Sequence, residues 1–131
     1  MRIQLLRTAA VAACLSAAVV GGLPSATAQG EPVLGTPMDQ YSEGFGTARP
    51  ATITQNSMCA NLVHNIVWDS WGGPVAHGAG VQCQSAGAAS RGEPVEPVSL
   101  TASDLGPCGG ILSYRTLQYD SNEPFPICPR G

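Results

Sequence analysis

Four of the five cysteines are spread widely along the later part of the chain, and they limit the ways in which it can fold. They are Cys59, Cys83, Cys108 and Cys128. None belongs to a Cys-x-x-Cys pair, so their spacing is not that of a zinc ribbon or a thiol redox motif. An even number of cysteines in a short exported chain is typical of a disulfide framework. We therefore expect two disulfide bonds, worth about 2–4 kcal/mol each to a domain with a modest core.

The start of the chain has the pattern of a secretory signal peptide. It begins with positive charges at Arg2 and Arg7 and continues with an apolar stretch over residues 9–23. It ends with the cleavage-site pattern Ala26-Thr27-Ala28. The sequence therefore predicts a signal peptide over residues 1–28 and a secreted, extracellular protein that begins near Gln29.

The fifth cysteine, Cys14, lies inside this leader after Val11-Ala12-Ala13, a pattern that also precedes lipidated cysteines in bacterial lipoproteins. Only about six uncharged residues separate Arg7 from Cys14, whereas an export segment needs roughly 7–15. We therefore expect no lipid anchor at Cys14. No later apolar stretch approaches the roughly 18 residues of a membrane span, so we expect no transmembrane anchor.

The charge of the mature chain disfavours polyanionic partners. Without Arg2 and Arg7, four arginines and nine acidic residues remain, which gives a net charge of −5 with no lysine. Binding to a phosphate backbone requires clustered cations. The composition therefore argues against nucleic acid and anionic membranes as partners.

Residues 29–50 contain several prolines and glycines without a periodic pattern, which predicts a flexible N-terminal arm. From residue 51 onward, short segments rich in β-branched residues alternate with turns. Strands are expected over residues 51–54, 62–71, 75–83, 95–102 and 111–119, with turns at residues 72–74, 92–94, 106–107 and 121–126. Residues 84–93 are expected to form a loop, because two glycines disfavour a helix there. Residues 51–131 are thus predicted to form one small all-β domain: a disulfide-bonded β-sandwich or partly closed barrel of about five to seven short antiparallel strands, and a monomer.

The stretch IVWDSWGGPVAHGAGVQC, residues 66–83, is predicted to form most of a hairpin that turns at Gly72-Gly73. In the expected register the numbers of paired residues add up to 145, so that Trp68 faces His77 on a mainly apolar face. Cys59 and Cys83 can then bond to close the open end of the hairpin, which leaves Cys108 to bond with Cys128.

The polar residues of this hairpin give no convincing catalytic or metal site. In the expected register His64 and His77 lie roughly 13 Å apart, too far to share a metal ion. Asp69 and Ser70 point to opposite faces of a strand, which disfavours a Ser-His-Asp triad. Glu93 and Glu96 each precede a proline and are expected on an exposed edge. We expect no cofactor and no enzymatic activity, and we take Trp71 as a candidate binding-surface residue.

The hairpin resembles the signature of small secreted actinobacterial proteins of unknown function. The matching pattern is aliphatic-x-Trp-x-Ser/Thr-Trp-Gly followed by Ala-x-Gly-x-Gly, framed by Cys59 and Cys83. Many of those proteins have two closely spaced cysteines after the glycines, whereas this chain has one. The resemblance implies a compact secreted domain and brings no catalytic residues with it.

Two functions remain open from the sequence, besides a hydrolase, which requires a catalytic arrangement around His64 or His77 in the folded chain. The first is a non-enzymatic module with a binding or structural role, whose partner is a protein or a component of the cell envelope. The second is a protease inhibitor that presents Arg91 on the loop Gln84–Glu93. This alternative draws on a resemblance of residues 99–119 to secreted subtilisin inhibitors, although their Cys-Pro and Gly-Thr-His-Pro segments are missing.

Overall fold

The computed structural model describes residues 30–129, whose strands form one sheet curled into a half-barrel. The strands are β1 (Val33–Leu34), β2 (Val63–Trp68), β3 (Ala76–Gln82), β4 (Pro97–Cys108), β5 (Ile111–Tyr119) and β6 (Phe125–Pro126). Their order is β1-β5-β4-β3-β2, with β6 also paired to β5, and only β1 runs parallel to its neighbour. The predicted all-β fold and partly closed barrel are confirmed.

Both expected disulfide bonds are present. Cys59 and Cys83 are joined with their Cα atoms 5.1 Å apart, and Cys108 and Cys128 with theirs 6.0 Å apart. The first bond joins the open end of the β2–β3 hairpin to the 3-10 turn Cys59–Asn61. The second attaches the C-terminal segment to the end of β4. The pairing expected from the hairpin register is therefore confirmed.

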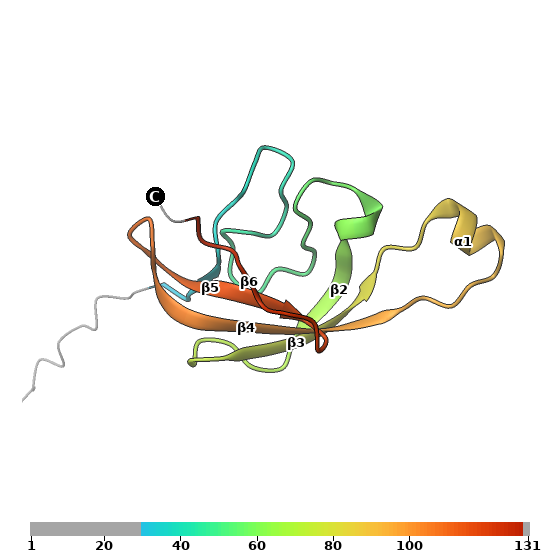
Figure 1. Ribbon diagram of the computed structural model, residues 1–131. Helices are drawn as coiled ribbons and strands as arrows, with labels where there is room; N and C mark the ends of the chain where they lie inside the picture. Colours follow the sequence, from blue (N-terminus) through green and yellow to red (C-terminus); the bar gives the residue numbers. More distant parts are fainter. Residues whose placement is uncertain (1–29, 130–131) are drawn as a thin grey trace, which may run out of the picture.

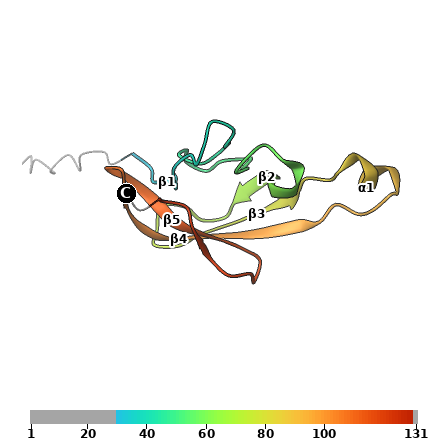
Figure 2. The ribbon, with the colours of Figure 1, turned by 45° about the horizontal axis from the view of Figure 1, so that its top comes forward.

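Loop segments that precede β2 cover one face of the sheet, and the core lies between the two layers (Figure 1). The fully buried side chains come from both layers: Tyr114, Leu34, Ile53, Leu100, Leu117, Ile127, Thr54 and Ser113. At one end of the sheet the segment that carries α1 (Ala86–Ser90) projects away from this core, as Figure 2 also shows.

Most of the segment expected as a flexible arm is part of the folded domain. Val33 and Leu34 pair with Ser113 and Tyr114 of β5, and the side chains of Leu34 and Phe45 are buried. The expectation of a free arm is therefore corrected from residue 30 onward, because isolated apolar residues between the turns fill the core. The signal peptide and Cys14 lie outside the described residues. Within residues 30–129, no helix has the length and apolar character of a membrane span.

The register of the β2–β3 hairpin changes at a bulge that the sequence analysis did not predict. His64 pairs with Val81 as expected, but Trp68 pairs with Gly78 instead of His77. The shift occurs around Asn65, whose φ of 53° lies in the left-handed region. In β3, which carries no bulge, Ala76 and Gly78 face the core and the side chain of His77 is exposed. The predicted apolar face of β3 is therefore wrong.

Glycines on the inner face of β3 explain this choice of register. A Cβ atom on Gly78 would lie 2.8 Å from the ring of Trp68, and one on Gly80 would lie 2.8 Å from both the His64 carbonyl oxygen and the Ile66 side chain. Only glycine leaves room for these neighbours. With His77 inward, its ring would have to occupy the space that Trp68 fills.

Two further expectations about turns and strands are corrected. Gly106 and Pro107 belong to β4, and the chain turns at Gly109-Gly110, where φ is 58° and 82°. Both values suit glycine in a tight hairpin turn. Residues 51–54 form only isolated bridges, from Ile53 to Val63 and from Thr54 to Glu43.

Candidate binding site

Trp71 is packed between other aromatic rings. Its ring centre lies 4.7 Å from that of Trp68 and 5.0 Å from that of Tyr114, both in edge-to-face geometry. Its indole N–H donates a hydrogen bond of 2.9 Å to the Pro32 carbonyl oxygen. Trp71 thus ties the loop after β2 to the start of the described chain, and its ring is only partly exposed.

The two histidines lie at positions that keep them apart. His64 is partly buried opposite Val81, and His77 is exposed four residues earlier on β3. At about 3.3 Å per strand residue, their backbones are roughly 13 Å apart. Within residues 30–129 no group of three or more His, Cys, Asp or Glu side chains has metal-binding geometry.

The segment from Gln84 to Glu96 forms a braced projection, which we call the α1 projection. Contrary to the sequence analysis, Ala86–Ser90 is helical despite its glycine, because the Ser85 side chain accepts the Ala88 N–H and caps the helix. The Gln84 side-chain amide donates to the Glu93 carbonyl oxygen, which closes the loop at its base. The Cys59–Cys83 bond holds the strand that leads into it.

Arg91, the other candidate binding-surface residue, lies at the C-terminal end of α1 with helical backbone angles, φ −85° and ψ 0°. Its side chain is exposed, and its Nε donates a hydrogen bond of 2.9 Å to the Glu93 carboxylate. Arg91 therefore lies on the outside of the projection with its charge already paired.

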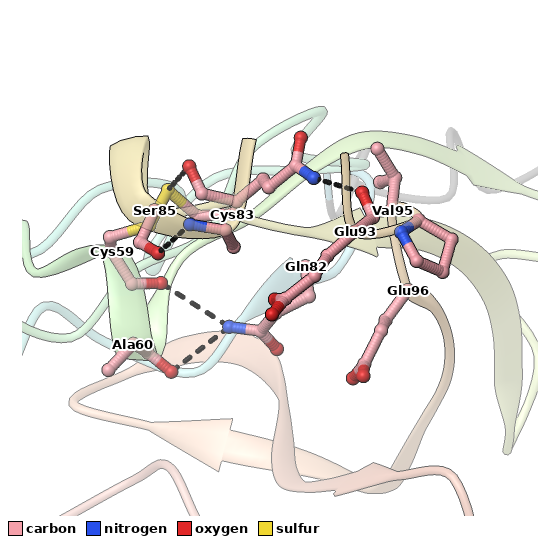
Figure 3. A pocket seen from close by; sticks show the side chains of 11 residues that line it. Cys59, Ala60, Gln82, Cys83, Ser85, Glu93, Val95 and Glu96 are labelled. Atoms are coloured by element: carbon pink, nitrogen blue, oxygen red, sulfur yellow. Dashed lines mark hydrogen bonds between the residues drawn. A yellow bond between two sulfur atoms is a disulfide. The ribbon is translucent and has the colours of Figure 1, made fainter. Parts of the chain in front are cut away.

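A cleft of about 290 Å³ lies between the α1 projection and the end of the β2–β3 hairpin (Figure 3). One side is formed by Cys59 and Ala60, and the facing side by the extended residues 93–96. Its lining residues are Cys59, Ala60, Gln82, Cys83, Gln84, Ser85, Ala88, Glu93, Pro94, Val95 and Glu96. The disulfide bond itself is part of the wall.

Gln82 fixes the shape of this cleft. Its side-chain amide donates to the Ala60 carbonyl oxygen at 3.0 Å and to the Cys59 carbonyl oxygen at 3.3 Å (Figure 3). Its backbone N–H donates to the Glu96 carbonyl oxygen at 2.9 Å, so the same residue ties the two sides together. The cleft is thus held by a covalent bond and several hydrogen bonds.

The sequence predicts one end of this region but not the cleft. The loop Gln84–Glu93 is expected from the sequence as the inhibitory loop, whereas Gln82 carries no sequence signal and Glu96 is expected only as a charge on an exposed edge. The cleft joins residues 59–60 to residues 82–96. Only the predicted Cys59–Cys83 bond signalled that these two segments meet.

Near the opposite side of the hairpin end, burial raises the pKa of Tyr119 to about 12. We expect a tyrosinate component near pH 12 in the absorbance titration of the wild-type protein, and its loss in Tyr119→Phe. Because the folded pKa lies above the unfolded value of 10.0, both states are neutral below about pH 10. Above that pH the unfolded state ionises first, so stability falls between about pH 10 and 12. Identical titration curves for the two proteins would contradict this assignment.

The braced cleft combines a concave shape, a geometry fixed by the disulfide bond and accessible polar groups. Comparison of the chain with models of protein families, with curated proteins and with solved structures finds no match.

Proposed function

We propose that the mature chain is a secreted, non-enzymatic binding module that engages a protein or a component of the cell envelope through the braced cleft. The observation that carries this proposal is the fixed geometry of the cleft beside the Cys59–Cys83 bond. A site that is already ordered loses less conformational entropy when a ligand binds. Two disulfide bonds suit the oxidising space outside the cell.

The size of the cleft limits what it accepts. Pockets for drug-sized ligands and cofactors span about 300–1,000 Å³, so a cleft of about 290 Å³ lies at the lower limit. It suits one side chain and the adjoining backbone of a partner. A short peptide segment therefore fits the cleft better than a large cofactor.

The structure gives no support to Arg91 as the residue of an inhibitory loop. Peptides that add to an enzyme or sheet edge do so in extended form, whereas the backbone of Arg91 is helical and its side chain is paired with Glu93. We therefore expect no stoichiometric inhibition when the protein at micromolar concentration is titrated against trypsin-like and subtilisin-like proteases.

Panning a displayed peptide library against the oxidised mature protein tests the proposed function. We expect enriched peptides whose binding is lost in Ala88→Trp, because this substitution places a large ring in the cleft wall. The matched control is Ala89→Trp, since Ala89 is exposed on the same helix and does not line the cleft. Peptides that bind both variants equally, or no enrichment at all, would reject the cleft as the binding site.

A further inference from the structure

The polar groups around the cleft are mainly hydrogen-bond acceptors. Both Glu93 and Glu96 line it, together with the side-chain amide of Gln82. Because the amide nitrogen of Gln82 is used on backbone carbonyl oxygens, its oxygen remains as an acceptor, and no described residue donates to it. Neither lysine nor arginine lines the cleft. The site therefore favours a ligand that brings donors and positive charge.

Of the two carboxylates that line the cleft, Glu96 is the one available to pair with such a ligand. All three arginines within residues 30–129 are already paired with other carboxylates: Arg49 with Glu31, Arg91 with Glu93, and Arg115 with Asp104. Among the described residues, none forms an ion pair or a side-chain hydrogen bond with the Glu96 carboxylate. The chain thus supplies no cation of its own here, and the net negative charge of the mature protein attracts a basic partner.

The remaining lining is apolar and lies beside these acceptors. It consists of the Cys59–Cys83 disulfide and the side chains of Ala60, Ala88, Pro94 and Val95. Val95 is 48% exposed, which is high for an aliphatic residue. Apolar walls next to an unpaired carboxylate match a side chain with a long hydrocarbon stem and a cationic end.

We propose that the cleft binds an arginine or lysine side chain presented by a peptide segment of the partner. The stem packs on the disulfide and the alanine side chains, and the cation meets Glu96 at the rim. Arginine fits better than lysine, because its planar guanidinium offers five donors to several acceptors at once. This inference rests on the proposed binding function and specifies the chemistry that the cleft recognises.

Titration of the isotopically labelled mature protein with an acetylated and amidated Ala-Arg-Ala tripeptide, followed by NMR, tests the inference. We expect saturable shifts of the backbone amides of Gln82, Ala88 and Val95. The same tripeptide with citrulline, which is nearly isosteric and neutral, should bind about fivefold more weakly, as expected for one partly exposed ion pair. Raising the salt concentration should reduce the difference.

Glu96→Gln removes the negative charge at residue 96 and leaves the shape of the cleft nearly unchanged. This variant should bind the arginine and citrulline tripeptides equally, while Glu123→Gln, which makes the same charge change outside the cleft, should keep the preference. Equal binding of both tripeptides by the wild-type protein would overturn the inference. If library peptides compete for the cleft but contain no basic residue, the inference fails while the proposed function stands. If no peptide binds the cleft, both fail.

Discussion

Tyr114→Ala is expected to lower the free energy of unfolding by about 3–5 kcal/mol, as for other fully buried aromatic residues. Tyr114 is the largest side chain with no exposed surface, and its ring packs edge-to-face on Trp71. Its hydroxyl accepts the Gly72 N–H at 2.8 Å and donates to the Gly73 carbonyl oxygen at 2.7 Å. Removal of the side chain therefore leaves a cavity and frees the β2–β3 turn. Urea unfolding followed by tryptophan fluorescence measures the loss.

Tyr114→Phe is the matched control for this prediction. It keeps the ring and removes only the hydroxyl, so the expected loss is about 1–3 kcal/mol from the unpaired groups at Gly72 and Gly73. The alanine variant should be clearly less stable than the phenylalanine variant. Equal losses in the two variants would show that the ring contributes little, contrary to the packing described above.

The elements that the sequence predicted correctly are those specified by short-range patterns. Alternating residues and flanking turns located β2, β3 and β5, and the hairpin turn placed Cys83 near the 3-10 turn that carries Cys59. These signals are local, because strand alternation and turn residues act over only a few positions. The disulfide pairing followed from them without any knowledge of the tertiary structure.

The bulge at Asn65 could not be predicted in this way. A single residue in the left-handed region shifts one half of the hairpin by one position, so that Val63 before the bulge and Ile66 after it both face the core, while β3 alternates without interruption. Its cause is the tertiary fit of Trp68 against Gly78, which no local sequence pattern encodes. Burial of Leu34 and Phe45 was missed for a related reason, since single apolar residues in loops have no period.

The sequence does not predict the cleft, because the two sides of the cleft are far apart along the chain. Residues 59–60 and 93–96 become neighbours only when the disulfide bond and the Gln82 hydrogen bonds are in place. The proline that follows Glu96 predicts only an exposed edge, and the role proposed for Glu96 depends on which arginines are already paired. Such pairing is a property of the folded chain.

Joint replacement of Cys59 and Cys83 by serine is expected to lower the free energy of unfolding by about 2–5 kcal/mol, the range known for native disulfides in small secreted domains. The bond connects residues 24 positions apart and forms part of the cleft wall. Its loss should also loosen the α1 projection, so that amide hydrogen exchange in residues 84–96 becomes faster under conditions in which β4 and β5 remain protected.

The other disulfide provides a control with a similar global effect and a different local one. Joint replacement of Cys108 and Cys128 by serine removes a bond of sequence separation 20, so the chain-entropy contribution is nearly the same. This bond lies outside the cleft lining. Exchange in residues 84–96 should then stay at the wild-type rate, and the preference for the arginine tripeptide should persist. If both double variants loosen residues 84–96 equally, the Cys59–Cys83 bond does not brace the cleft, and its preorganisation must come from the hydrogen bonds of Gln82 and Gln84 alone.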